Sequence, residues 1–336
     1  MRKTDRYWIW YGVLFLCLTL FSTSVAASSD LEKCSDQPQA DFDKKICKIS
    51  ITKLHLTQYS VGQVAVACKI KQVDDWVEDY LDENKEADNV SALNHFLESD
   101  KNHIPLVRGP KGSLGEGFYT TDHHHLGAAV WNSKTFKKLS DKKKAKVNFV
   151  GLIKADFKNE SWPDFWQKMI DQDKVWPYDN RGERIAQERF KGEFGPYPAD
   201  FGILYDNDHN DPYRTLSRWV RESCLYLKAG NKQCGDIAKL SGITPKEADF
   251  MEFVWANYLR KKLPWPTETN IADENILLSL YSLSPAPVRD PEAKAWLTQH
   301  HYNPQDYGYH ENGLYLYLNF NKHSCEKSTD HVIAPM

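Results

Sequence analysis

A strand hairpin that leads directly into a helix is the feature that most constrains how this chain can fold. The run Ile104-Pro-Leu-Val-Arg108 predicts one strand, and Phe118-Tyr-Thr-Thr121 predicts a second strand after a glycine-rich loop. Asp122-His-His-His-Leu-Gly-Ala-Ala-Val-Trp131 follows at once and predicts a helix, with Asp122 at the N-cap position. The sequence therefore places a helix N-terminus directly at the end of a hairpin.

The N-terminus of this expected helix carries the chemistry of the segment. Free backbone N–H groups and the positive end of the helix dipole bind anions there, phosphate above all. Imidazoles at this point, from His123, His124 and His125, can donate to phosphate or act as general acid or base. Asp122 can cap the helix, orient a histidine or hold a divalent cation. The sequence thus predicts a phosphate-binding, catalytic turn.

Two residues of the preceding loop, Arg108 and Lys111, are expected to close over the ligand. Three consecutive histidines on a helix point about 100° apart, so a metal ion held by this run alone is the weaker interpretation. A capped helix with solvated or packed histidines is the structural alternative. The loop does not match the Walker pattern, which excludes a P-loop.

Further elements are expected on both sides of this motif. Before it, the pattern predicts a strand, a short helix and one or two acidic helices broken near Asp88-Asn89, over 49–56, 61–73 and 74–99. After it, we expect a strand, two long helices, a short helix and a last strand, over 147–157, 213–227, 245–263, 292–300 and 314–320.

The start of the chain reads as a cleavable signal peptide over residues 1–27. Three basic residues precede an uncharged apolar run over 8–21, which is shorter than the roughly 20 residues of a membrane-spanning helix. Small residues then allow cleavage after Ala26 or Ala27. We therefore expect an exported protein, periplasmic or secreted, and weigh an uncleaved anchor as the alternative.

Six cysteines remain after the signal, and an exported protein with an even number can form disulfides. Cys224 and Cys234 enclose a short loop and are the first expected pair. Cys34 with Cys47 is the second, which leaves Cys68 with Cys325. Buried free thiols are the alternative. The net charge of −3 does not indicate a nucleic-acid binder but leaves room for a local basic groove.

Four blocks of the chain resemble the ParB-like nuclease family of the ParB/sulfiredoxin superfamily. They are Leu54-His-Leu-Thr-Gln-Tyr-Ser-Val-Gly62, Ile104-Pro-Leu-Val-Arg-Gly-Pro110, Gly117-Phe-Tyr-Thr-Thr-Asp-His-His-His-Leu126, and the pair formed by Asp211-Pro-Tyr-Arg-Thr-Leu-Ser-Arg-Trp-Val-Arg221 and Phe250-Met-Glu-Phe-Val-Trp-Ala-Asn-Tyr-Leu-Arg260. Together they span roughly residues 49–262, most of the chain.

The resemblance implies an α/β (α+β) fold with a ParB/sulfiredoxin-like core over 45–158. A mainly helical part of the same domain over 159–263 and a C-terminal extension over 264–336 follow. In this superfamily the Asp-His-His turn binds nucleotide or phosphate. The wider pattern is Asp-Gly-His-(His/Thr)-Arg, whereas here His123 replaces the glycine and Leu126 the arginine. The reactive cysteine of sulfiredoxin has no counterpart in the turn.

Three arginines of the fourth block are expected to replace the arginine that the wider pattern has at the position of Leu126. Arg214, Arg218 and Arg221 recur at helical spacing, so they share a face that can clamp phosphate. The alternative is a surface face paired with acids such as Asp211 and Glu222. Glu252 and Arg260 are first of all candidates for ion pairs between packed helices.

A helix-turn-helix-like segment over 234–247 is interpreted as a disulfide-closed turn, because an exported protein meets no chromosome to read. The function implied by the resemblance is that of a nuclease acting on a phosphodiester or nucleotide substrate outside the cytoplasm, with Asp122 and Mg²⁺ or Mn²⁺ as the expected metal site. His124 is the expected general base or donor, and His123 or His125 is expected to assist. The first alternative is a nucleotide-dependent small-molecule kinase. The second is a non-catalytic, secreted module that binds nucleotide or phosphate.

Overall fold

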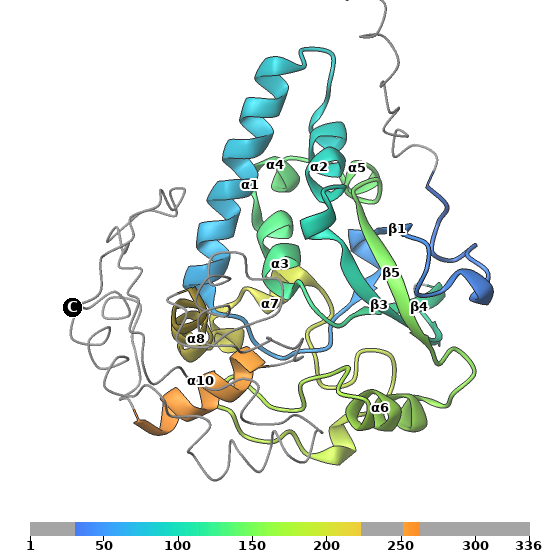
Figure 1. Ribbon diagram of the computed structural model, residues 1–336, viewed down its shortest axis with the longest axis vertical. Coiled ribbons are helices and arrows are strands. Elements are labelled where there is room, and N and C mark those ends of the chain that lie inside the picture. The colour runs from blue at the N-terminus through green and yellow to red at the C-terminus, as the bar shows by residue number, and fades with distance from the viewer. Residues whose placement is uncertain (1–30, 114, 223–250, 263–336) are drawn as a thin grey trace, which may run out of the picture.

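The computed structural model describes residues 31–113, 115–222 and 251–262, and its architecture is mixed α/β (Figure 1). The predictions for the signal peptide, for Cys224, Cys234 and Cys325, for the 234–247 segment, and for the elements over 292–300 and 314–320 lie outside the described residues. The α/β class implied by the resemblance is confirmed.

A five-stranded sheet forms the centre of the fold, in the order β1-β5-β3-β4-β2. Its strands are β1 (Cys47–Ser50), β2 (Leu54–His55), β3 (Ile104–Gly112), β4 (Gly115–Thr120) and β5 (Asn148–Asp156). The pairs β1/β5 and β3/β4 are antiparallel, whereas β3/β5 and β2/β4 are parallel. The predicted hairpin and the strand near 147–157 are confirmed. The strand predicted over 49–56 is two short strands separated by a single 3-10 turn, Ile51–Lys53.

Three helices pack beside the sheet: α1 (Gln63–Glu83), α2 (Asn89–Leu97) and α3 (His124–Asn132). The boundary predicted between residues 73 and 74 is wrong, because α1 runs through it without interruption. The sequence turns acidic there, but a change of charge does not end a helix, and Val73 and Val77 continue the same buried face. The predicted break at Asp88 is confirmed, since its carboxylate accepts from Ser91 N at 2.9 Å.

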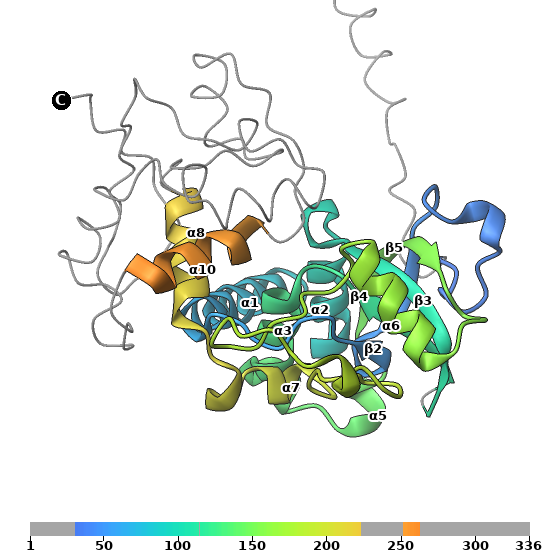
Figure 2. The same cartoon turned by 90° about the horizontal axis from the view of Figure 1, so that it is seen from below.

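The remaining helices follow α3 along the chain. They are α4 (Lys134–Lys137), α5 (Asp141–Lys144), α6 (Trp162–Asp171), α7 (Phe201–Leu204), α8 (Pro212–Glu222) and α10 (Met251–Lys262). The aromatic rings of α6 pack on Tyr119 of β4, with ring centroids 4.6 Å apart for Phe165. Seen from below, α10 crosses α8 (Figure 2). The helices predicted from residue 213 and before residue 263 are confirmed for their described parts.

A disulfide joins Cys34 to Cys47, which confirms the second of the expected pairs. It fastens the segment before the sheet to the first residue of β1. Cys68 is also disulfide-bonded, so none of the three cysteines in the described ranges is a free thiol. Within those ranges no helix is long and apolar enough to cross a bilayer.

Candidate functional site

The turn between β4 and α3 is compact and held by its own polar groups. Thr120 Oγ1 donates to the Asp122 carbonyl oxygen at 2.6 Å. Asp122 Oδ1 accepts from His123 N, also at 2.6 Å. The N-cap of α3 is therefore His123 and not Asp122 as expected. The Asp122 carboxylate accepts from the backbone N–H of His123, which precedes the first residue of the helix. The His123 side chain makes no capping hydrogen bond to the first turn of α3, and the N–H groups of a first helical turn are groups that can bind an anion.

His123 adopts a left-handed backbone conformation, with φ of 64° and ψ of 21°. This region favours glycine and costs other residues roughly 1 kcal/mol. The wider superfamily pattern has glycine at this position, so the turn keeps the glycine geometry while adding an imidazole. Strain of this kind gathers at functional sites.

His124 is buried and faces the segment between β2 and α1. Its Nε2 accepts from Thr57 N at 3.1 Å. The Thr57 hydroxyl in turn donates to the Thr120 carbonyl oxygen at 2.7 Å. Burial lowers the pKa of His124 to about 3, against a smaller opposing effect of Asp122. The ring is therefore neutral, with its proton on Nδ1, because Nε2 acts as an acceptor.

His125, the next residue of α3, makes an equivalent bond. Its Nε2 accepts from Gly62 N at 3.1 Å. Burial is the main cause that holds its pKa well below the usual range, and the positive charges of Arg214, Arg218 and Lys69 add to it. Together the two imidazoles fasten the 57–62 loop to the start of α3. Neither can act as a base through Nε2.

Asp122 is exposed, and His123 and His125 are both half-buried. His125 differs from His123 in that its Nε2 already accepts from Gly62 N. No group of three or more His, Cys, Asp or Glu side chains within the described ranges could hold a metal ion by itself. A divalent cation at Asp122 would need water and substrate oxygens as its other ligands, which is the usual coordination of Mg²⁺ at phosphates.

The arginines of α8 are largely engaged with α10. The Arg214 guanidinium is buried, lies 3.3 Å from the centroid of the Phe253 ring, and pairs with Glu252 at 3.4 Å. Arg221 also pairs with Glu252. Glu252 of the facing helix is thus an acid partner of both arginines, and its expected role between packed helices is confirmed. Arg218 is partly exposed, and its charge reaches His125.

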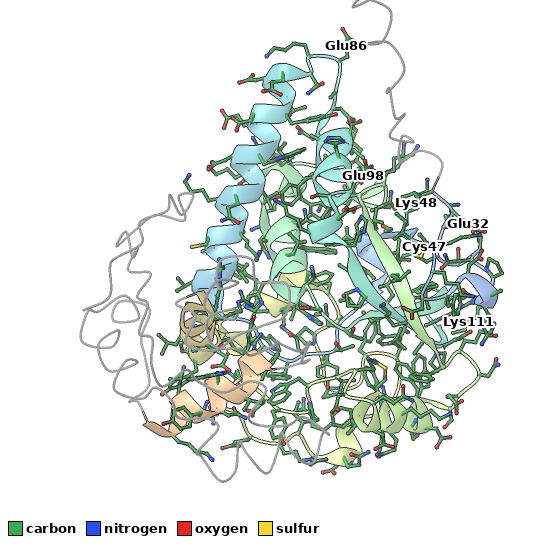
Figure 3. All side chains as sticks on the ribbon, in the orientation of Figure 1. Glu32, Cys47, Lys48, Glu86, Glu98 and Lys111 are labelled. Carbon is green, nitrogen blue, oxygen red and sulfur yellow. A yellow bond between two sulfur atoms is a disulfide. The ribbon has the colours of Figure 1, made fainter. Side chains whose placement is uncertain are left out.

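Arg108 and Lys111 do not lie beside the turn. Arg108 is buried, pairs with Glu116 across the hairpin and stands opposite Phe118. Asp122 follows Phe118 by four residues, roughly 13 Å of extended chain. Lys111 lies farther out, near the end of the hairpin and away from α3 (Figure 3). Their assignment to phosphate stays a prediction, without support from proximity.

Three further residues help to build the site and stand outside the set predicted from the sequence. Thr57 and Gly62 supply the amides that the histidines accept, and Lys69 adds a positive charge from α1. Thr57 and Gly62 lie in the first of the four blocks, and this position is the sequence feature that points to a role in the site. Lys69 lies outside all four blocks, so no sequence feature points to its role.

These features define an α/β protein whose candidate site is a strand–turn–helix junction. A family model described as "Putative ParB-like nuclease" matches residues 47–261, so the chain belongs to this family. No curated protein matches the chain. A solved structure, that of protein Atu1540 from Agrobacterium tumefaciens, is similar at 21% sequence identity and a TM-score of 0.43, covering 72% of this chain and 93% of that one.

Proposed function

We propose that the protein is a hydrolase of the ParB-like nuclease family that cleaves a phosphodiester or nucleotide substrate at the N-terminus of α3. One observation carries the proposal. The first turn of α3 has no capping hydrogen bond from its N-cap side chain, and Lys69, Arg214 and Arg218 place positive charge near His125 in that turn. The amides of a helix N-terminus and positive charge at one point favour a phosphate group.

In this proposal His123 is the catalytic acid or base, because the Nε2 atoms of His124 and His125 are engaged as acceptors from Thr57 N and Gly62 N. It takes a proton from the attacking water, whose oxygen forms a bond to phosphorus. The bond from phosphorus to the leaving oxygen breaks, and that oxygen receives a proton. Asp122 orients the water or contacts Mg²⁺ or Mn²⁺, which would supply positive charge at the phosphate. His124 and His125 are positioning residues that hold the 57–62 loop.

The test is cleavage of single-stranded DNA, duplex DNA, RNA and bis(p-nitrophenyl) phosphate by the purified chain from residue 28, with Mg²⁺, Mn²⁺ or EDTA. We expect His123→Gly to lower kcat by about 100-fold, the lower range for loss of a general acid or base. This variant keeps the turn, since glycine favours its backbone conformation. An exposed histidine elsewhere, His95→Gly, is the matched control. Equal turnover by His123→Gly and the parent would contradict the assignment.

A non-catalytic phosphate-binding module is the second candidate. It is favoured by the engagement of His124 and His125 as hydrogen-bond acceptors, which leaves few groups for catalysis. A thermal-shift screen with nucleotides, with and without Mg²⁺, separates the two candidates. Stabilisation without turnover on long incubation supports the module. Consumption of ATP that depends on a small alcohol would instead support the kinase alternative.

We also propose that the protein is exported, either to the periplasm or to the medium. The Cys34–Cys47 disulfide is the supporting observation, since disulfides persist in oxidising compartments. Fractionation followed by N-terminal sequencing is the test. We expect a chain that begins at Ala27 or Ser28, and an intact N-terminus on a cytoplasmic product would contradict export.

A further inference from the structure

Two segments of opposite charge lie at one end of the molecule. Residues 74–86, at the end of α1 and just beyond it, contain seven acidic residues and one lysine. Residues 134–146, which include α4 and α5, contain seven lysines and one aspartate. We call them the acidic segment and the lysine segment. The whole chain carries a net charge of only −3, so the two segments concentrate charge of opposite sign.

Most of this charge is exposed and is not neutralised within the described ranges. Glu78, Asp79 and Glu83 are exposed and form no ion pair there. The same holds for the lysine segment at Lys137, Lys138, Lys142 and Lys146. The described ion pairs use other members: Asp75 pairs with Lys71 at 2.6 Å, Asp82 with Lys85 at 3.0 Å, Lys144 with Asp141 at 3.7 Å and Lys143 with Asp88 at 3.5 Å.

The charges of the acidic segment lower the stability of α1, the helix that carries most of them. Its acids repeat at four-residue spacing, which brings like charges together on the helix surface. They also stand at the C-terminal end of α1, where the helix dipole disfavours negative charge and no basic residue occupies the last turn. Opposite charge from outside the chain would relieve this cost.

The two segments are neighbours on the surface. Lys143 of the lysine segment pairs with Asp88, just after the acidic segment, at 3.5 Å. The Asp74 carboxylate accepts from Lys134 N at 3.2 Å. The far end of α1, with α2, α4 and α5, forms one end of the molecule (Figure 1), and Glu86 marks its tip (Figure 3).

Adjacent patches of opposite sign are complementary to themselves under a two-fold rotation, since each patch of one copy then faces the other patch of its partner. A nucleic acid would be repelled by the acidic segment, and a cationic peptide by the lysine segment. We propose that this surface binds a second copy of the chain and forms a salt-sensitive, isologous dimer. The inference is independent of the proposed activity.

The test is sedimentation of the purified chain from residue 28 at about 20 mM and about 0.5 M NaCl, where the Debye length falls from roughly 20 Å to roughly 4 Å. We expect a dimer at low salt. At high salt we expect the dissociation constant of the dimer to be at least about tenfold larger. The acidic reversal variant is Glu78→Lys, Asp79→Lys, Glu83→Lys. The lysine reversal variant is Lys137→Glu, Lys138→Glu, Lys142→Glu.

Each reversal variant alone is expected to be monomeric, and a mixture of the two to form a heterodimer. Reversal of three exposed acids elsewhere, Asp171, Glu183 and Glu188, is the matched control and leaves the dimer intact. Circular dichroism establishes that each variant is folded. A parent chain that stays monomeric at low salt, reversal variants that still dimerise, or a folded mixture that does not associate would each overturn the proposal. Binding of heparin or DNA by the lysine segment without self-association would also overturn it.

Discussion

His125 Nε2 accepts a hydrogen bond from the backbone amide of Gly62, and this bond joins the start of α3 to the start of α1. A third helix meets them at the same place. A Cβ atom added to Gly62 would lie 2.8 Å from Thr215 N, in the first turns of α8. Three helix N-termini therefore converge on one glycine, and the candidate site depends on that close approach.

Substitution of Gly62 by alanine tests this convergence. We expect Gly62→Ala to lower the free energy of unfolding by about 1–3 kcal/mol, because overpacking forces α1 and α8 apart. Urea unfolding measures it. Thr215→Ala removes the hydroxyl that is also close to the added methyl, so the double variant is expected to recover part of the loss. Strict additivity of the two substitutions would contradict a direct contact.

Replacement of His123 by glycine is expected to stabilise the fold while impairing the site. Relief of the left-handed strain raises the free energy of unfolding by roughly 1 kcal/mol. His123→Ala keeps a Cβ and removes the imidazole, so it is expected to show no such gain. Urea unfolding of both variants at neutral pH makes the comparison, and equal stability of the two would rule out strain at this residue.

The pH dependence of stability follows from His124. Its folded pKa of about 3 lies below the ordinary value near 6.5, so protonation favours the unfolded chain. The stabilisation is complete above about pH 6.5 and is lost as the pH falls towards 3, at up to about 1.4 kcal/mol per unit. His124→Gln removes this titration. We expect its stability to fall less than that of the parent between pH 7 and 4, and parallel profiles would contradict a buried neutral imidazole.

The ion pair between Arg260 and Asp211 is expected to hold α10 against α8. Its atoms are 2.6 Å apart and Asp211 is buried, which raises the pKa of that carboxyl despite the arginine. Arg260→Met leaves the Asp211 carboxylate without this cation. We expect the substitution to lower the free energy of unfolding by about 3–5 kcal/mol. Adding Asp211→Asn removes the buried charge and restores part of the stability. A double variant no better than the single one would show that the cost comes from lost packing.

The elements that follow local patterns could be predicted from the sequence. The hairpin, β5 and the helix break at Asp88 each depend on neighbouring residues, namely alternation for the strands and a capping carboxylate for the helix. The N-cap of α3 was predicted one residue too early, because Asp122 satisfies the capping preference but bonds to His123 N instead.

The partners of the site residues could not be predicted, because they come from distant parts of the chain. Thr57 and Gly62 precede the histidines that they contact by 67 and 63 residues. Glu252 follows Arg214 by 38 residues and lies on another helix. Helical spacing places the arginines on one face, but the packing of α8 on α10 decides which charge meets that face.

The two outer strands of the sheet are its shortest. β1 has four residues and is held by the Cys34–Cys47 disulfide, and β2 has two. A free sheet edge is a template on which strands of other molecules can add, and edges this short offer few backbone groups for such growth. The arrangement therefore limits strand-mediated aggregation at both edges of the folded protein.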